Sequence, residues 1–479
     1  MKKILFVASE AMPFAATGGL GDVIGSLPTA LAAGGKCDVR VILPLYGQVK
    51  DEWRALMQEE TVFELSLSWR RIYCGVKSLK KDGVTYYFVD NEYYFKRATL
   101  YGSYDDGERF AYFSMAALSL LEQVGFYPDV LHAHDWQAAL SVIYLRELFS
   151  KRPEYAAIRS VFTIHNIEYQ GKYDKAILGD VFALPQESEG VVEYDGCINL
   201  MKGAIECADL VSTVSPRYAE EIQSPEYAHG LSPVLCRHAG KLMGILNGID
   251  YVYYDPKGDR AIAANYTWRS LPKKAANKTA LQREIGLPED ENIPMLTIIS
   301  RLATHKGLDL VREIAYNLLE TQNIQLVVLG MGESVYEDFF RSLEACFPQK
   351  LRALITYDRD LSKRIYAASD IFIMPSKSEP CGLSQMIASR YGAIPVTRET
   401  GGLYDSIKGY YVKGGKVMGN GFTFANYRSD ELYDRILAAL SVWSDEEARA
   451  ALVRKIMRTD FSWGVSAEQY QAMYERLVP

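Results

Sequence analysis

The chain has 479 residues, of which 48% are hydrophobic and 24% are charged, and its net charge is −7. At roughly 150 residues per domain, this length predicts two or three domains, and two large α/β domains fit it as well. The acidic balance argues against a general affinity for nucleic acid. No run approaches the ~18 apolar residues that a membrane span requires, so we expect no membrane partner.

The seven cysteines are scattered along the chain, and no two of them form a CxxC pair. An odd, dispersed set is typical of reduced thiols in a cytosolic protein rather than of a disulfide framework or a zinc site. The apolar run at residues 4–8 is shorter than the ~7–15 residues of a signal-peptide core. We therefore interpret this run as a buried first strand and expect a cytoplasmic protein.

The first half of the chain alternates short apolar runs with amphipathic stretches. Residues 108–123 carry apolar side chains at helical spacing. Strands that alternate with helices imply right-handed βαβ units and a parallel sheet. The runs that predict strands are residues 4–8, 39–43, 84–89, 130–131 and 161–164.

The second half shows the same alternation without repeating the sequence. Its clearest predicted helices are residues 307–319 and 333–345. Its predicted strands are residues 295–299, 325–329, 354–356, 370–374 and 394–396. The fold class is therefore α/β, with two Rossmann-like domains. Open α/β sheets bind ligands at the carboxyl ends of their strands, so two such domains facing each other would form a deep cleft.

The domain boundary is predicted near an Asn-Gly turn at Asn247, which follows a short predicted strand at residues 242–246. A mobile polar stretch is expected to follow, through Lys273 and Lys274. We predict an N-terminal domain of residues 1–245 and a C-terminal domain of residues 246–460. The last segment, residues 461–479, contains an amphipathic helix whose docking site does not follow from the sequence.

Three polar motifs follow predicted strands of the first half. TGGLGDV begins at Thr17, and its glycines allow a tight turn and the approach of an anion to a helix start. Taken by itself, this motif is also explained by a strand-to-helix turn that binds no ligand. HAHDWQ places His132 and His134 on one face of a strand. Since no third ligand accompanies them, we do not expect a metal, and a polar set at a strand end suits hydrogen bonding to a sugar better. The third motif, FTIHNIEYQG, places His165 beyond a buried strand.

Three further motifs follow strands of the second half. Arg301 and Lys306 straddle a helix start, where a guanidinium fork, an ammonium and a helix dipole favour phosphate, although a solvated basic loop is the alternative. EPCGLSQ, from Glu379, starts another helix and offers a carboxylate that can hold a sugar hydroxyl. A plain helix cap is the alternative there, but Glu is not a favoured cap residue. A second TGGL turn begins at Thr400.

These motifs, in this order, resemble those of the bacterial glycogen synthases and plant starch synthases, which are retaining glucosyltransferases of the GT-B fold. The resemblance covers essentially the whole chain and extends to TVSP, LNGID and FSW. It implies transfer of glucose from ADP-glucose to the non-reducing end of an α-1,4-glucan such as glycogen, with no metal and no cofactor. It also makes the N-terminal domain the acceptor side and the C-terminal domain the nucleotide-sugar side.

The resemblance implies roles for individual residues. Arg301 and Lys306 would bind the diphosphate and stabilise the leaving ADP. Glu379 would lie beside the donor sugar, and His165 and Asp135 near the glucosyl group and the acceptor. The residues implied in substrate binding, with an aromatic ring on adenine among them, are Thr17, Gly18, Gly19, Asp22, Asn247, Tyr357, Cys381, Gly382, Leu383 and Ser384. The ring assigned to adenine is that of Tyr357.

The first turn departs from the family pattern Lys-x-Gly-Gly-Leu, because Ala16 stands where the lysine is usual and no basic residue in that loop replaces it. A charged hydrogen bond is worth ~1.5–3 kcal/mol, or roughly tenfold to over a hundredfold in rate. Lys377 and Ser378 also replace the usual Arg-Phe before EPCG, which suggests altered packing beside the site. A weakened paralogue that binds glucan or partner enzymes is therefore the alternative to an active synthase. A transferase for another sugar nucleotide is a third hypothesis.

Overall fold

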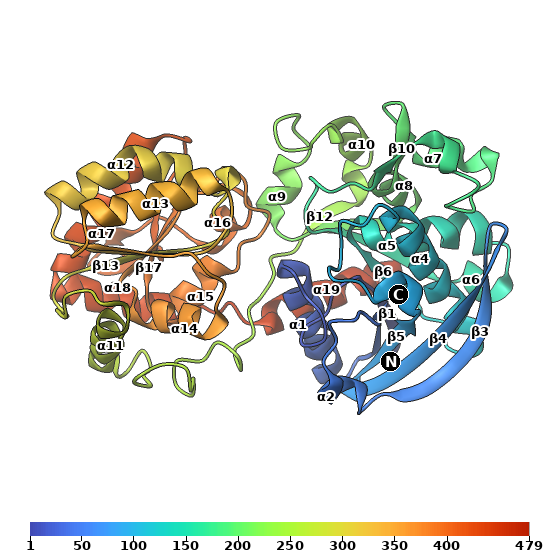
Figure 1. The fold of residues 1–479 in the computed structure, drawn as a ribbon, viewed down its shortest axis with the longest axis horizontal. Helices are drawn as coiled ribbons and strands as arrows, with labels where there is room; N and C mark the ends of the chain where they lie inside the picture. The colour runs from blue at the N-terminus through green and yellow to red at the C-terminus, as the bar shows by residue number, and fades with distance from the viewer. Residues whose placement is uncertain (479) are drawn as a thin grey trace. The chain divides into compact units, whose positions relative to one another are not determined.

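The computed structural model describes residues 1–478, which form two compact units (Figure 1). The N-domain comprises Met1–Asn247 together with the chain from Trp463 onward, and the C-domain comprises Gly248–Ser462. Within the described residues, no helix is long and apolar enough to cross a membrane.

The N-domain is built on a nine-stranded sheet of order β12-β11-β7-β6-β1-β2-β5-β4-β3. From β12 to β5 every neighbouring pair is parallel, with Val7 opposite Ile42 and His134 opposite Thr163. The parallel strands are β1 (Lys2–Val7), β2 (Cys37–Pro44), β5 (Val84–Asp90), β6 (Val130–His134), β7 (Arg159–Ile164), β11 (Leu210–Thr213) and β12 (Leu242–Gly244). All the strands predicted for the first half are confirmed.

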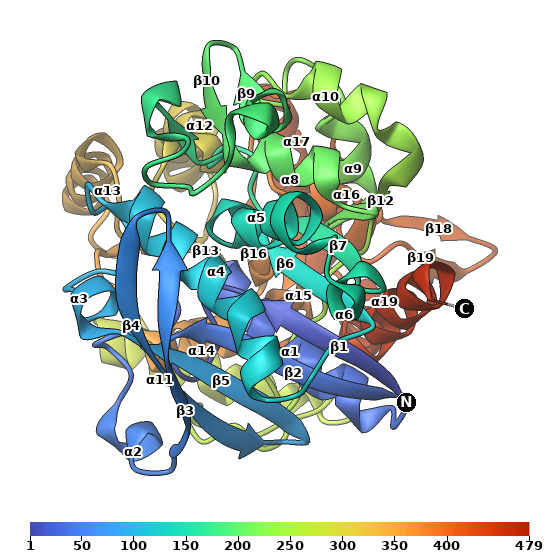
Figure 2. The same ribbon diagram turned by 90° about the vertical axis from the view of Figure 1, so that its right-hand side faces the viewer.

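Besides β11, two strands of this sheet were not predicted. β3 (Gln58–Leu67) and β4 (Arg70–Lys81) form an antiparallel hairpin on the edge beyond β5. Their pairing with β5 ends where Gly75 meets Asp90, so the first residues of β4 run on past the end of β5 (Figure 2). Because β3 is largely exposed and rich in polar residues, it lacks the apolar run that marks a buried strand.

Helices cover both faces of the N-domain sheet. α4, α5 and α8 lie on one face, and α1 and α19 lie on the other (Figure 2). A small sheet of β8 (Lys172–Tyr173), β9 (Glu193–Tyr194) and β10 (Cys197–Asn199) lies outside the main one. The helices are α1 (Gly19–Ala33), α2 (Asp51–Arg54), α3 (Glu92–Phe95), α4 (Asp106–Gln123), α5 (Asp135–Tyr144), α6 (Pro153–Ala156), α7 (Glu189–Val192), α8 (Leu200–Cys207), α9 (Pro216–Glu221), α10 (Ser232–Arg237) and α19 (Trp463–Leu477).

The last helix, α19, docks on the N-domain although the chain reaches it from the C-domain. It packs along α1, and the Ser466 hydroxyl donates a hydrogen bond to the Leu246 carbonyl at 2.6 Å. The Tyr474 hydroxyl lies 2.7 Å from Nδ1 of His132 in the core. The sequence did not predict where this helix docks. The structure places it on the face of the N-domain sheet that α1 also covers.

The C-domain contains a six-stranded sheet of order β15-β14-β13-β16-β17-β20, and all of its strands are parallel. In chain order this is 3-2-1-4-5-6, the Rossmann arrangement. The strands are β13 (Met295–Ile299), β14 (Gln325–Leu329), β15 (Leu351–Leu354), β16 (Ile371–Met374), β17 (Ile394–Arg398) and β20 (Phe422–Phe424). The predicted strands are confirmed with one exception. A strand was expected at residues 354–356, but β15 ends at Leu354.

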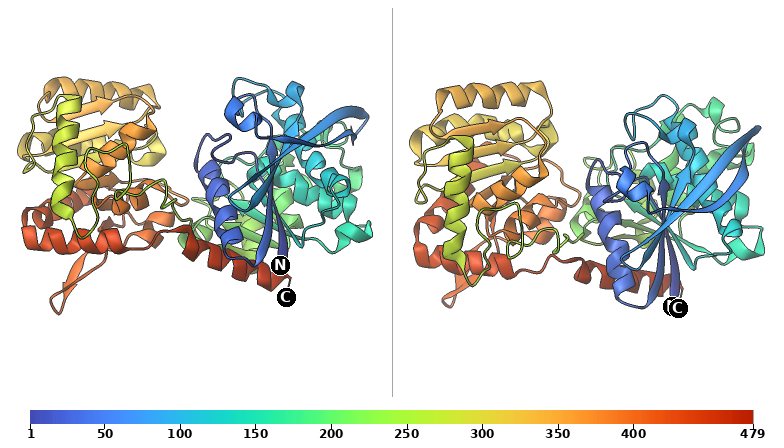
Figure 3. Two further views of the ribbon diagram at one scale, coloured as in Figure 1. Left: turned by 90° about the horizontal axis from the view of Figure 1, so that it is seen from below. Right: turned by 60° about the horizontal axis from the view of Figure 1, so that its bottom comes forward.

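Helices also cover both faces of the C-domain sheet, with α12 and α13 on one face and α11, α14 and α15 on the other (Figure 1). β18 (Tyr411–Lys413) and β19 (Lys416–Met418) form a short hairpin that projects from the domain (Figure 3). The helices are α11 (Ala275–Ile285), α12 (Leu308–Thr321), α13 (Ser334–Cys346), α14 (Arg359–Ala368), α15 (Ser384–Arg390), α16 (Gly401–Ser406), α17 (Ser429–Ser444) and α18 (Glu446–Arg458).

Each domain has a topological switch point, where the strand order reverses. In the N-domain it lies between β1 and β6, and in the C-domain between β13 and β16. Loops leaving such a pair of strands diverge to opposite faces and leave a crevice at the carboxyl edge, which is where ligands of these sheets bind. The motifs TGGL, SRLATHKG and EPCGL follow three of these strands, and HAHD spans the end of the fourth, β6.

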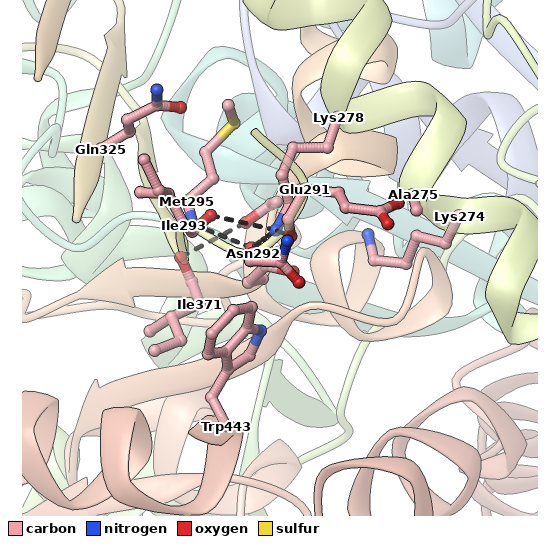
Figure 4. A network of polar contacts seen from close by, with 12 residues as sticks. Lys274, Ala275, Lys278, Glu291, Asn292, Ile293, Met295, Gln325, Ile371 and Trp443 are labelled. Atoms are coloured by element: carbon pink, nitrogen blue, oxygen red, sulfur yellow. Dashed lines mark hydrogen bonds and ion pairs between the residues drawn. The ribbon is translucent and has the colours of Figure 1, made fainter. Parts of the chain in front are cut away.

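At the opposite edge of the C-domain sheet, α11 buries a charged lysine. Lys278 Nζ lies 2.5 Å from the Asp370 carboxylate and donates to the carbonyl oxygens of Glu291 at 2.8 Å and Ile293 at 3.1 Å (Figure 4). The ammonium also lies 5.0 Å from the centroid of the Trp443 ring. Three acceptors and an aromatic face therefore replace the water that this charge loses on burial.

Lys274 lies beside this network, and its Nζ donates to the Ala367 carbonyl at 2.6 Å. Burial is the main cause that lowers the pKa of Lys274 to about 7. This hydrogen bond anchors the amine at the end of the stretch that was predicted to be mobile. The helix that follows, α11, packs against α14.

Replacing Lys274 with methionine is expected to change how stability depends on pH. The folded chain holds this amine with a pKa of about 7, whereas an unfolded lysine has a pKa of ~10.4, so the unfolded chain binds more protons between those values. Relative to Lys274→Met, the native free energy of unfolding should rise by roughly 2–4 kcal/mol as the pH is raised through this window. Urea titrations at several pH values measure this. Lys273→Met, at the exposed neighbour, should keep the native slope, and an unchanged slope in Lys274→Met would contradict the prediction.

Candidate active site

The loop after β1 is held by a buried carboxylate. Glu10 accepts hydrogen bonds from the Thr17 amide and hydroxyl at 2.6 Å each and from the Gly18 amide at 3.3 Å. The Tyr101 hydroxyl donates to the same carboxylate at 2.7 Å. The sequence analysis did not select Glu10. The signal that could have found it is an acidic residue within a buried segment directly after a parallel strand.

Gly18 and Gly19 are exposed, and a side chain at either position would meet no protein atom within 4 Å. Packing within the N-domain therefore does not require glycine here, and the small residues leave the start of α1 open to a ligand. Asp22 lies half-buried in the first turn of that helix. Ala16 is half-buried, and its methyl group occupies the space beside Gly21 that a side chain there would need.

The loops after β6 and β7 are tied together by Asp135. This residue begins α5 with φ +57°, a left-handed conformation that costs a non-glycine residue of order 1 kcal/mol or more. Its carboxylate accepts the amide N–H groups of His165 at 2.7 Å and Asn166 at 3.4 Å. Burial raises the pKa of Asp135 to about 7 and lowers the pKa of His165 to about 3, so this imidazole is neutral near pH 7.

His132 and His134 lie on the same face of β6, as predicted, with ring centroids 4.1 Å apart. Both are fully buried. Nδ1 of His132 lies 2.7 Å from the Tyr474 hydroxyl, and its Nε2 lies 2.6 Å from the Thr163 hydroxyl. His134 Nδ1 lies 2.9 Å from Nε2 of His165. Both imidazoles thus pack inside the domain, and Nε2 of His134 has no hydrogen-bond partner among the described residues. The sugar contact predicted for this polar strand end stays a prediction. Among the residues that the structure describes, no group of three or more His, Cys, Asp or Glu side chains could hold a metal ion.

Asn247 ends the N-domain and is buried. Its Oδ1 accepts no hydrogen bond from residues 1–478. A buried acceptor without a partner costs about 1–3 kcal/mol, so this oxygen is suited to a donor from a ligand.

Lys306 and Glu379 bridge the loops after β13 and β16. Lys306 Nζ donates to Glu379 Oε2 at 2.7 Å, and the Ser376 hydroxyl donates to the same oxygen at 3.0 Å. Gly307 has φ +74°, and a side chain there would collide with the carbonyl of Pro375. The two loops thus approach backbone to backbone across the switch point, and the ammonium is held between them.

Arg301 and Tyr357 lie in loops at the same edge of the C-domain sheet and are exposed. In contrast to Lys306, the Arg301 guanidinium has no hydrogen bond or ion pair with the described part of the chain. The Tyr357 hydroxyl accepts a hydrogen bond from Nε of Arg359 at 3.0 Å, and most of its ring remains open to solvent. One cation is therefore fixed and the other is free to reach a ligand.

The second TGGL turn packs against the loop that carries Glu379. Gly401 has φ +42°, and a side chain there would collide with the carbonyl of Glu379, while one at Gly402 would collide with the carbonyl of Cys381. The Gly402 amide also donates to the Glu379 carbonyl at 3.1 Å. Unlike Gly18, these glycines are required by the protein's own packing.

The segment from Cys381 to Ser384 leads into α15, which begins at Ser384, so the predicted helix start is confirmed. Cys381 is buried, and Gly382 has φ +68°. Gln385 Nε2 donates to the carbonyls of Cys381 at 3.2 Å and Gly382 at 2.8 Å. The structure thus gathers the predicted donor-side residues in one edge of the C-domain, and the roles assigned to them stay predictions.

Comparisons with known proteins extend over both domains. Residues 3–237 match the family model described as starch synthase catalytic domain, and residues 277–456 match glycosyl transferases group 1. The glycogen synthase of Bacillus subtilis (strain 168) is 46% identical over 477 residues, which are 99% of this chain and 98% of that protein. The glycogen synthase of Streptococcus agalactiae serotype III is 45% identical over 478 residues, or 99% and 100% of the two chains.

Solved structures show the same likeness. The catalytic domain of starch synthase IV from Arabidopsis thaliana, bound to ADP and acarbose, is 36% identical with a TM-score of 0.90, and the match covers 100% of this chain and 99% of that one. A sucrose-phosphate synthase from Thermosynechococcus elongatus, 16% identical with a TM-score of 0.61, shares the fold.

Gly401→Ala should destabilise the C-domain by about 2–4 kcal/mol, because the new methyl group adds a collision with a carbonyl to the strain of a positive φ. Gly414→Ala is a matched control, since Gly414 also has positive φ but has no protein atom within 4 Å of an added side chain. It should cost only about 1 kcal/mol. Denaturant titration of both variants measures the difference, and equal losses would show that the close approach does not matter.

Proposed function

Since the chain belongs to the family of glycogen synthases and starch synthases, we propose that it transfers glucose from ADP-glucose to the non-reducing end of an α-1,4-glucan such as glycogen, with retention at the anomeric carbon. The chain is a glycosyltransferase with two Rossmann-like domains. The observation that supports a diphosphate-bearing donor is the pair of cations at the C-domain switch point, one held by Glu379 and one free.

Arg301 and Lys306 bind the diphosphate of the donor in this proposal. An ammonium has three hydrogen-bond donors, so Lys306 can keep its bond to Glu379 and still donate to phosphate oxygens. The exposed Arg301 guanidinium can add a bidentate contact. As the glycosidic bond breaks, negative charge grows on the departing ADP, and fixed cations stabilise that charge more in the transition state than in the ground state.

The remaining C-domain residues orient the donor. Glu379 and the segment from Cys381 to Ser384 hold the glucosyl hydroxyls and the distal phosphate, and Tyr357 stacks on adenine. The exposure of the Tyr357 ring supports this role. The backbone contacts of the second TGGL turn keep this segment in place.

The N-domain supplies polar groups near the reacting carbon and the acceptor. Thr17, Gly18, Gly19 and Asp22 contact substrate from the first loop, and the buried Asn247 oxygen accepts a hydrogen bond from a sugar hydroxyl. Glucosyl transfer passes through an oxocarbenium-like state with positive charge at the anomeric carbon. Asp135, with a pKa of about 7, is partly ionised near neutral pH and can stabilise that charge, whereas the neutral His165 acts as a hydrogen-bonding group.

The reaction as proposed uses no metal and no cofactor, because two side-chain cations supply the charge for the leaving group. A cytoplasmic location is part of the proposal, and all seven cysteines are free thiols. Neither nucleic acid nor a membrane has a role in it. Nothing in the comparisons favours the weakened paralogue that Ala16 suggested.

The direct test is release of ADP from ADP-glucose with glycogen as acceptor. The native protein should be active, and Arg301→Ala should lower kcat/KM by roughly a hundredfold because it removes a transition-state contact. Since the Arg301 side chain makes no hydrogen bond or ion pair with the described part of the chain, replacing it should leave folding unchanged. Arg260→Ala, at an exposed C-domain position, is the control. A native protein that releases no ADP from this donor would refute the function, and full activity in Arg301→Ala would refute the assigned role.

Ala16→Lys should raise kcat/KM for ADP-glucose by about tenfold or more, because it adds a charged hydrogen bond at the open start of α1. Ala16→Met, with a side chain of similar length and no charge, should not. The same ADP-release assay compares the two variants with the native protein. Equal rates in all three would mean that another group already supplies this phosphate contact.

A further inference from the structure

An open groove of about 620 Å³ lies on the N-domain between the tip of the β3–β4 hairpin and α3. Its lining is mainly aromatic and charged, and Ile72 is the aliphatic residue in it. Three of its rings are largely exposed: Trp69 at 73%, Tyr73 at 55% and Tyr93 at 72%. A cluster of exposed large aromatic residues on a stable domain marks an interaction site rather than a packing defect.

The tryptophan is held rigidly at the tip of the hairpin. Leu67 pairs with Arg70, so Trp69 lies in a two-residue turn. Its indole N–H donates to the Asp180 carboxylate, and the Arg70 guanidinium lies 4.5 Å from the centroid of its ring. The Arg70 guanidinium thus covers one face of the indole, and the opposite face remains exposed for contact with a ligand.

The opposite wall is equally fixed. Tyr93 stands edge-on to Tyr94 with ring centroids 5.0 Å apart, and Tyr94 is buried with its hydroxyl on Glu108 at 2.6 Å. The other oxygen of Glu108 lies 3.2 Å from the Arg70 guanidinium. One carboxylate therefore joins both walls, so the groove is formed before any ligand arrives.

The groove lies at the edge of the sheet that carries the candidate active site. β5 runs parallel to β1 and β6 and ends at Asp90, and the short helix α3 that follows it contains Tyr93. The chain continues from α3 to Tyr101, whose hydroxyl donates to Glu10 under the first TGGL turn. A single connecting segment thus links the groove to the loop assigned to substrate binding.

We propose that this groove binds a stretch of the α-1,4-glucan away from its reacting end, an inference that rests on the proposed function. Glucose rings present C–H faces that pack on aromatic rings, and their hydroxyl edges suit the carboxylates and guanidiniums of the rim. The volume lies in the range that accommodates a short oligosaccharide. A glucan that is also held in the groove keeps its reacting end at a high effective concentration near the active site. A small acceptor cannot reach both sites and gains nothing from the groove.

The test compares glycogen binding and acceptor kinetics in the double variant Trp69→Ala/Tyr93→Ala. Mobility in native gels that contain glycogen should show an affinity roughly tenfold lower than that of the native protein. The KM for glycogen should rise by a similar factor, while the KM for ADP-glucose and kcat with maltotriose stay unchanged. Trp69→Phe/Tyr93→Phe should keep most of the binding. Tyr411→Ala, at a ring of 53% exposure in the C-domain, is the matched control.

Two results would overturn the groove assignment. The first is native-like retention by glycogen in the alanine double variant. The second is a loss of self-association in sedimentation experiments without any change in retention, which would make the groove a contact between copies of the chain. Because gel retention needs no turnover, a native protein that fails to use ADP-glucose but shows groove-dependent retention would refute the proposed donor and leave the groove supported.

Discussion

The ion pair between Lys306 and Glu379 holds the candidate donor site together. It joins the two loops that the Rossmann strand order brings to one switch point, and glycines at 307 and 401 let the neighbouring backbones approach closely enough for the pair to form. A largely buried ion pair adds little net stability, but removing one partner is costly. The ion pair therefore serves to position the Lys306 ammonium, while the nearby Arg301 guanidinium remains free to bind a ligand.

The two TGGL turns show how one sequence pattern serves two physical purposes. In the C-domain, the glycines at 401 and 402 are required because carbonyl groups of the Glu379 loop occupy the space of a side chain. In the N-domain, Gly18 and Gly19 face open space, and the turn is held from beneath by Glu10. The C-domain turn supports a site, whereas the N-domain turn presents its backbone to a ligand.

Much of this architecture could be predicted from the sequence, because parallel strands buried on both faces are continuous apolar runs, and the motifs that follow them mark the carboxyl edge. The β3–β4 hairpin could not, since an exposed edge strand carries polar residues like a loop. The inward-facing roles of His132 and Lys274, and the docking of α19 on the N-domain, depend on partners far along the chain. The local sequence pattern holds no information on such contacts, and the same is true of the hydrogen bond between Tyr101 and Glu10.

The central claim is that the donor diphosphate binds at the C-domain switch point, and a crystal structure of the protein with ADP tests it most directly. The account predicts diphosphate oxygens within about 2.7–3.2 Å of the Arg301 guanidinium and Lys306 Nζ, with Glu379 still bonded to the lysine and adenine against the ring of Tyr357. Ordered ADP bound anywhere else, with Arg301 and Lys306 making no contact to phosphate, would contradict it.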